Sequence, residues 1–237
     1  MRRAGERQDW TVRDIPDQSG RTAVVTGADS GLGYETALAL AGAGTDLVIA
    51  ARNSEKGQAA VARIQAAHPR ASVLFKALDL ASLISVASFA ARMADQRQRI
   101  DLLVNNAGVA APTRRKETAD GFELQFGTNH LGHFALAVRL LPLLRRGTDA
   151  RVVTVSSVMH KTGRIDFDDL QCERRRYSPT RTYSQSKLAN LLFARELQRR
   201  SDGGGWGLLS DAAHPGMART ELVANGLERD HPRLIAL

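Results

Sequence analysis

Short apolar runs alternate with longer amphipathic segments over most of the 237-residue chain. The apolar runs predict buried strands at about 21–26, 47–51, 72–78, 101–105 and 151–155, with a poorer sixth strand at 206–213. Helices are predicted from 34 to about 42, after Ser54 as N-cap up to 67, and at 82–96, 129–144 and about 182–200. This alternation favours right-handed crossovers, so we expect an α/β fold with one doubly wound parallel sheet and helices on both faces.

The domain organisation follows from the same pattern. Residues 1–20 are polar and punctuated by proline, and we expect them to form an N-terminal arm. Residues 21–237 contain no internal repeat and no second boundary, so they are predicted to be a single domain.

The composition is that of an ordinary globular protein, with 43% hydrophobic and 24% charged residues. No apolar stretch reaches transmembrane length, and the N-terminus lacks the apolar segment of a secretory signal. The single cysteine, Cys172, excludes an internal disulfide. We therefore expect a cytoplasmic protein without a membrane span.

The net charge of +8 raises the question of nucleic-acid binding. The basic clusters at 114–116, 145–146, 174–176 and 199–200 lie mostly where predicted helices end or loops begin. No recognition-helix, zinc or aromatic-stacking motif accompanies them, so we expect no nucleic-acid partner. A basic nucleic-acid binder remains a third hypothesis, and it predicts strongly salt-dependent binding without any nicotinamide dependence.

A glycine-rich turn, residues 26–33, connects the first predicted strand to the first helix. Gly31 and Gly33 allow the backbone to approach a ligand closely, and the N-terminal amides of the helix point at an anion. The turn predicts the dinucleotide site of a Rossmann-type domain. For an isolated motif, the alternative is a tight strand-to-helix connection without a ligand.

Polar residues also follow the other predicted strands. Arg52 follows the second strand, Asp79 and Leu80 the third, residues 105–108 the fourth, and Ser156 and Ser157 the fifth. Ligands of such sheets bind at the carboxyl ends of the strands, so one rim is expected to carry all of these residues.

Tyr183 and Lys187 are four residues apart, so both side chains project from one face of a helix. A nearby ammonium stabilises a phenolate and brings the pKa of a tyrosine toward neutral pH, where it can transfer a proton. Ser157 can hydrogen-bond a substrate carbonyl or alkoxide. Taken alone, such a pair is usually a packed aromatic ring and a snorkelling amine. The alternatives for Asn129 and Ser157 are a satisfied core amide and an ordinary strand-end hydroxyl. Mutually consistent roles at one rim favour the functional interpretation.

These motifs occur in the order found in the short-chain dehydrogenase/reductase family, and the chain resembles that family over nearly its whole length after the arm. The resemblance rests on the glycine-rich turn at 26–33, Asn105-Asn106-Ala107-Gly108, Asn129, the Tyr-x-x-x-Lys element at 183–187, and Pro215-Gly216 with Thr220. Segments 14–16, 128–134 and 166–170 are most similar to the retinol-dehydrogenase-like branch.

The resemblance implies a catalytic tetrad of Asn129, Ser157, Tyr183 and Lys187. It selects Ser157 over Ser156, gives Lys187 a contact to the nicotinamide ribose, and gives Asn129 a part in a proton relay through water. The expected cofactor-binding residues are Gly27, Asp29, Ser30, Gly31, Leu32, Gly33, Arg52, Asp79, Leu80, Asn106, Ala107, Gly108, Tyr183, Lys187, Pro215, Gly216 and Thr220.

The predicted function is an oxidoreductase that interconverts an alcohol and a carbonyl by hydride transfer. Its substrate is expected to be small and lipophilic, and loops 109–116 and 159–179 and the segment after Pro215 are expected to select it. The second strand ends in Arg52 without a carboxylate, so NADP(H) is expected in preference to NAD(H). The alternative function is a catalytically silent dinucleotide-binding redox sensor or scaffold.

Three further expectations concern metal binding, assembly and the C-terminal edge of the sheet. His130, His133, His160 and His214 lack convincing metal spacing, so no metal is predicted. The family resemblance favours a homo-oligomer. Only residues 217–237 follow the Pro-Gly turn, too few for both a helical lid and a seventh strand, so we expect an incomplete C-terminal edge with the sixth strand exposed.

Overall fold

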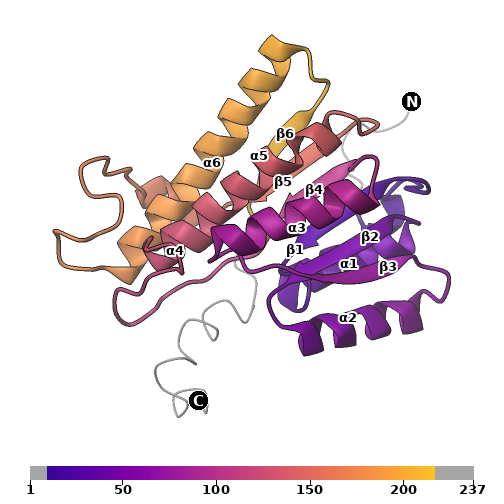
Figure 1. Ribbon diagram of the computed structural model, residues 1–237, viewed down its shortest axis with the longest axis horizontal. Coiled ribbons are helices and arrows are strands. Elements are labelled where there is room, and N and C mark those ends of the chain that lie inside the picture. Colours follow the sequence, from indigo (N-terminus) through magenta and orange to yellow (C-terminus); the bar gives the residue numbers. More distant parts are fainter. Residues whose placement is uncertain (1–9, 217–237) are drawn as a thin grey trace, which may run out of the picture.

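The computed structural model describes residues 10–216. Within this range six parallel strands form one sheet in the order β3-β2-β1-β4-β5-β6 (Figure 1). They are β1 (Thr22–Thr26), β2 (Asp46–Ala51), β3 (Val73–Ala77), β4 (Leu102–Asn105), β5 (Arg151–Val155) and β6 (Leu209–Ala213). The predicted α/β fold with a doubly wound parallel sheet is confirmed.

Helices cover both faces of this sheet. They are α1 (Gly31–Gly42), α2 (Ser54–Ala67), α3 (Leu83–Gln96), α4 (Leu124–Phe126), the π-helical segment η2 (Gly127–Leu131), α5 (Gly132–Leu144) and α6 (Pro179–Gly204). Two short 3₁₀ segments, η1 (Val12–Asp14) and η3 (Val158–Thr162), complete the described elements. The helices α1 and α2 pack on one face, and α3, α5 and α6 pack on the other.

The core has two layers because successive side chains of a strand point to opposite faces. In β1, Ala23 and Val25 pack with the α1 and α2 side, whereas Val24 packs with Phe89 of α3 and Leu140 of α5. All five of these side chains are inaccessible to water. Burial on both faces explains why β1 reads as a continuous apolar run.

The strand order reverses at β1, which lies between β2 and β4. The chain leaves β1 toward one side of the sheet and later returns to the other side through β4. The connections therefore diverge at the carboxyl ends of β1 and β4, and a crevice opens there.

Several predicted boundaries differ from those observed. The N-cap of α2 is Asn53, whose side chain accepts the amide of Lys56, and not Ser54. The predicted helix 129–144 begins earlier, at 124, and is interrupted by η2. Helix α6 runs from 179 to 204 because Ser178 caps its start, and Gly205 ends it in the left-handed conformation (φ 59°). Strand β6 is shorter than predicted, since residues 206–208 have no regular structure and the strand begins at Leu209.

Strand β6 is at the edge of the described sheet, as expected, and pairs there with β5 alone. The expected lid and seventh strand lie outside the described residues. In the described part of the arm, the amide of Gln18 donates to the carbonyl of Ala43, but most side chains from 10 to 20 are exposed.

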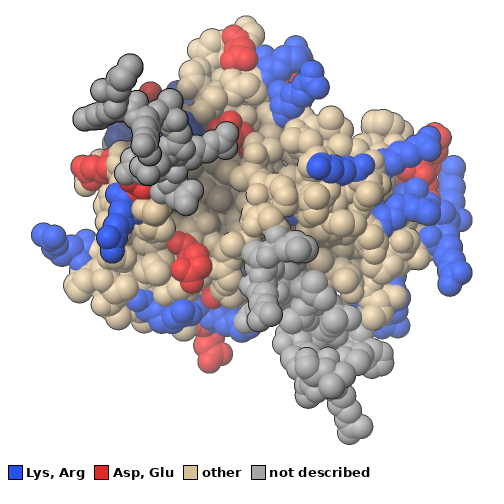
Figure 2. Space-filling model, turned by 180° about the vertical axis from the view of Figure 1, so that it is seen from behind, with Lys and Arg blue, Asp and Glu red and all other residues tan. Residues whose placement is uncertain are grey.

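The surface charge is dispersed on the face seen in Figure 2, where basic side chains lie at several separate places around the edge. Acidic side chains lie between some of them. Among the described helices, none combines the length and the apolar character that crossing a membrane requires.

Candidate functional site

A cleft of about 320 Å³ lies at the carboxyl ends of the strands. The glycine-rich turn, the end of β2, the segment after β4, the end of β5 and the first turns of α6 line it. The structure thus brings together residues that are up to 189 positions apart, from Gly27 to Gly216. The predicted site residues that line the cleft are Gly27, Asp29, Ser30, Gly31, Leu32, Gly33, Arg52, Leu80, Asn106, Ala107, Gly108, Ser157, Tyr183, Lys187, Pro215 and Gly216.

The glycine-rich turn requires its glycines for two separate reasons. Gly27 and Gly31 adopt positive φ angles of 64° and 53°, which residues other than glycine rarely adopt. Gly33 has no room for a side chain, since a Cβ there would lie 2.2 Å from the carbonyl oxygen of Gly27. The Ser30 hydroxyl makes no capping bond to α1, so it leaves the first amides of that helix available to an anion.

The segment after β4 is tied to the end of β1. The Thr26 hydroxyl accepts the amides of Asn106 at 2.9 Å and Ala107 at 3.0 Å. In return, the Asn106 side chain donates to the carbonyl of Thr26 at 2.8 Å. These bonds hold the two strand ends together and fix the floor of the cleft.

Ser157, Tyr183 and Lys187 meet at the opposite wall. Ser157 lies directly after β5, and its hydroxyl is close enough to Tyr183 to influence the pKa of that phenol. The Lys187 ammonium is 5.6 Å from the centre of the Tyr183 ring and donates to the carbonyl of Val155 at 3.0 Å. Ser156 points elsewhere, because its hydroxyl donates to the backbone carbonyl of Lys187.

Burial dominates the electrostatics of this trio. Burial raises the pKa of Tyr183, and the nearby Ser157 hydroxyl opposes that rise. Burial also lowers the pKa of Lys187 to about 8. Burial therefore determines the direction of the pKa of Tyr183, and the lowering expected from Lys187 stays a prediction.

Asn129 does not line the cleft; its neighbour Thr128 does. The Asn129 side chain accepts the Val109 amide at 2.8 Å and donates to the Val109 carbonyl and the Ser186 hydroxyl, both at 3.0 Å. All of these partners belong to the protein. The Asn129 side chain therefore links the segment after β4 to helix α6, and its part in a proton relay stays a prediction.

Arg52 and Asn53 line the other end of the cleft. Lys56 lines it as well, and the sequence analysis did not identify this residue. The signal was present, because Lys56 is four residues after Arg52 at the start of a predicted helix. Asp79 is not among the lining residues, since its carboxylate accepts the amide of Ala81. Thr220 lies outside the described residues.

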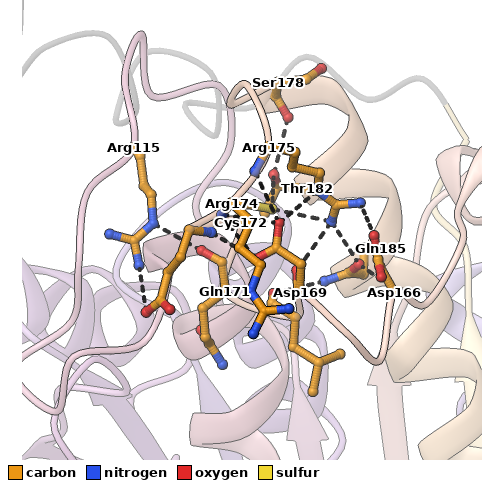
Figure 3. A network of polar contacts seen from close by, with 12 residues as sticks. Arg115, Asp166, Asp169, Gln171, Cys172, Arg174, Arg175, Ser178, Thr182 and Gln185 are labelled. Carbon is orange, nitrogen blue, oxygen red and sulfur yellow. Dashed lines mark hydrogen bonds and ion pairs between the residues drawn. The ribbon is translucent and has the colours of Figure 1, made fainter.

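The loops expected to select the substrate are joined by a polar network. Gln125 is completely buried, accepts the Ala111 amide at 3.2 Å, and donates to Tyr177 and to the Pro179 carbonyl. Figure 3 shows Arg175 between Asp166, Asp169 and Gln185, the last of which lies on α6 close to Tyr183. The network thus anchors both loops to the helix that carries the tyrosine.

Within residues 10–216 no group of three or more potential metal ligands comes together. Four of the histidines there have other partners. His160 contacts the Ser157 carbonyl, His214 accepts the Gly216 amide, His130 contacts Asn190, and His133 is buried between Thr26 and Asn129.

Comparison with known proteins gives three relevant similarities. The sequence model of the family described as short chain dehydrogenase matches residues 21–230. Retinol dehydrogenase 13 from Homo sapiens is 46% identical over 203 residues, which cover 86% of this chain and 60% of that protein. Polyprenol dehydrogenase from Mus musculus is 46% identical over 220 residues, which cover 91% of this chain and 65% of that protein.

A solved structure is also similar over most of its length. The crystal structure of an uncharacterized protein from Mycobacterium paratuberculosis is 49% identical, with a TM-score of 0.79 over 92% of this chain and 76% of that one. The chain thus spans about three fifths of the length of the curated relatives that it matches.

Proposed function

Because the chain belongs to the short-chain dehydrogenase family, we propose that it is an NADP(H)-dependent oxidoreductase that interconverts an alcohol and an aldehyde or ketone. The observation that carries the proposal is the meeting of Ser157, Tyr183 and Lys187 on one wall of a cleft whose other wall is the glycine-rich turn. A Cβ at Gly33 would fill the space beside Gly27, which supports a close approach of the cofactor's phosphates to this backbone.

The bound nicotinamide supplies or accepts the hydride. The chain's own groups then manage the proton and the oxygen. Tyr183 donates or accepts the proton through its hydroxyl, and Ser157, which lies close to Tyr183, orients the substrate oxygen. Lys187 holds the ribose and adds positive charge beside the phenol. Asn129 keeps the Val109 backbone and Ser186 in place around them.

The experiment that tests this function is Tyr183→Phe, assayed on a panel of alcohols and carbonyls with NADPH and NADP⁺. Turnover should fall by at least about 10²-fold, because the only proton-transfer group is lost, while NADPH binding changes by only a few fold. Tyr34→Phe is the matched control, since it removes the phenol hydroxyl of a different tyrosine, which lies on α1 and outside the cleft. Unchanged turnover in Tyr183→Phe would refute the assignment. A wild-type protein that binds NADPH without any turnover would favour the silent redox sensor.

The preference for NADP(H) is the second part of the proposal. Arg52, just after β2, and Lys56, in the first turn of α2, bring two cations to this end of the cleft. Among the described residues, the only carboxylate that lines the cleft is that of Asp29 in the glycine-rich turn. A charge-assisted bond to a 2′-phosphate contributes about 1.5–3 kcal/mol, so Arg52→Ala should weaken NADPH binding about 10- to 100-fold and NADH binding far less. Arg70→Ala controls for net charge, because Arg70 is exposed and outside the cleft. An equal loss for both nucleotides would exclude Arg52 as the selecting group.

The substrate class follows from the family relatives and the loops. Two relatives are named for retinol and polyprenol, which are both isoprenoid alcohols. We therefore extend the proposal to lipophilic isoprenoid alcohols or their aldehydes, selected by loops 109–116 and 159–179. Activity confined to short, polar alcohols in the panel would contradict this extension.

Location and assembly belong to the same proposal. A cytoplasmic location rests on the composition and the single cysteine, and fractionation of cells that express the protein tests it. A homo-oligomer is supported by exposed Phe134 and Val138 on α5 and Leu192 on α6, two helices in contact through Phe134 and Phe193. Light scattering after size exclusion should give a mass above the monomer's 25.7 kDa.

A further inference from the structure

His133 on α5 is a buried histidine outside the trio described above, and it contacts two functional segments at once. It is 1% exposed. Its Nδ1 atom lies 2.9 Å from the carbonyl oxygen of Asn129 in η2. Its Nε2 atom lies 2.9 Å from the Thr26 hydroxyl at the end of β1. The imidazole therefore bridges the helix that carries Asn129 and the strand that leads into the glycine-rich turn.

The partners of His133 determine where its proton lies. A carbonyl oxygen only accepts hydrogen bonds, so Nδ1 must carry the proton toward Asn129. Burial lowers the pKa of His133 to about 4, so the ring is neutral at pH 7 and Nε2 is an acceptor. The Thr26 hydroxyl must then donate its proton to Nε2.

This orientation leaves both lone pairs of the Thr26 hydroxyl oxygen for the backbone amides of the segment after β4. The hydroxyl oxygen accepts the amides of Asn106 and Ala107, which uses both of its acceptor positions. Its alternative acceptor is the Val104 carbonyl, at a longer distance of 3.3 Å. Ala107 also packs tightly on the nucleotide turn, since a Cβ at Gly27 would lie 2.9 Å from its Cα. A change in the direction of the hydroxyl would therefore reach the floor of the cofactor cleft and the glycine-rich turn beside it.

We propose that His133 is a positioning residue, which holds the Thr26 hydroxyl in the one orientation that fixes Asn106 and Ala107 for cofactor binding. It acts through Thr26 and touches no reacting group. This proposal rests on the proposed function, because its main test measures the binding of NADPH.

A double-mutant cycle on NADPH binding tests the bridge. His133→Asn keeps a donor near the Nδ1 position and removes the acceptor for Thr26, and Thr26→Val removes the hydroxyl. Each single variant should raise the Kd for NADPH about fivefold to tenfold, the equivalent of one net hydrogen bond. The double variant should be no worse than about twofold beyond either single variant, because both changes break the same contact. At saturating NADPH, kcat should stay within about threefold of the wild type, a split that general loss of structure would not give.

Matched variants distinguish the loss of this one contact from a general loss of structure. His133→Gln carries an acceptor near the Nε2 position and should restore much of the affinity, and Thr26→Ser should bind NADPH as the wild type does. His130→Asn makes the same change three residues earlier, where the imidazole contacts Asn190 instead, and should change Kd by less than about twofold. Additive losses in the double variant, or an equal loss in His130→Asn, would overturn the proposal.

A second readout is independent of the cofactor. The ¹⁵N shifts of the His133 ring, assigned with His133→Asn, should show a neutral imidazole with its proton on Nδ1 at pH 7. A proton on Nε2 would overturn the proposal even if NADPH binds. A wild-type protein with this tautomer that does not bind NADPH would overturn the positioning role as stated, and would count separately against the proposed function.

Discussion

Lys187→Met should stabilise the protein while abolishing its turnover. The Lys187 side chain is 3% exposed, and burial lowers its pKa from 10.5 to about 8. Lys187 therefore binds a proton less readily in the folded state than in the unfolded state. Below about pH 8 its buried charge lowers the free energy of unfolding by about 3 kcal/mol. Methionine has nearly the same length and shape and carries no charge.

The expected net gain is smaller because the lysine also makes one hydrogen bond. Its bond to the Val155 carbonyl is worth about 1 kcal/mol, and Asn190 still donates to that carbonyl at 3.3 Å in the variant. The free energy of unfolding without cofactor should therefore rise by about 2 kcal/mol at pH 7. The sign follows from a folded pKa below the unfolded pKa, so the cost disappears as the pH rises from about 8 to about 10.5.

Urea denaturation at pH 7 and pH 9.5 measures both effects. At pH 9.5 the cost of the buried charge falls to about 1 kcal/mol, so the variant and the wild type should be nearly equal. Lys161→Met is the control, because Lys161 is exposed and its change should stay within about 0.5 kcal/mol. A variant that is less stable than the wild type at pH 7, or a gain that is the same at both pH values, would refute the reasoning.

Two further predictions concern the glycine-rich turn and His133. Gly33→Ala should lower the thermal midpoint of unfolding and abolish NADPH binding, because its Cβ would lie 2.2 Å from the Gly27 carbonyl oxygen. Calorimetry measures the midpoint and fluorescence titration measures the binding. An affinity equal to that of the wild type would contradict the tight fit. The pKa of His133 is about 4 in the folded state, below its ordinary 6.5, so the unfolded state binds the extra proton and stability is lost as the pH falls from about 6.5 to about 4. This loss amounts to about 3 kcal/mol, and in denaturation series it should be missing from His133→Asn.

The sequence alone determined the fold and the order of its parts. Alternating apolar runs and amphipathic segments predicted the parallel sheet, and the six observed strands lie within or close to the predicted ranges. The glycines of the turn were informative because the backbone itself requires them, as the positive φ angles of Gly27 and Gly31 show. The rim at the strand ends followed from topology, since parallel strands end on one side.

Tertiary structure decided which groups touch and in what state. Helical spacing placed Tyr183 and Lys187 on one face, but the ammonium points at the Val155 carbonyl, so burial rather than charge sets the direction of the pKa of Tyr183. Likewise, Asn129 is turned toward Val109 and Ser186, and Asp79 toward Ala81. Hydrogen-bond partners and desolvation depend on residues far away in the chain, and local sequence patterns contain no information about them. For the same reason only the fold revealed His133 between Thr26 and Asn129, residues that lie 103 positions apart.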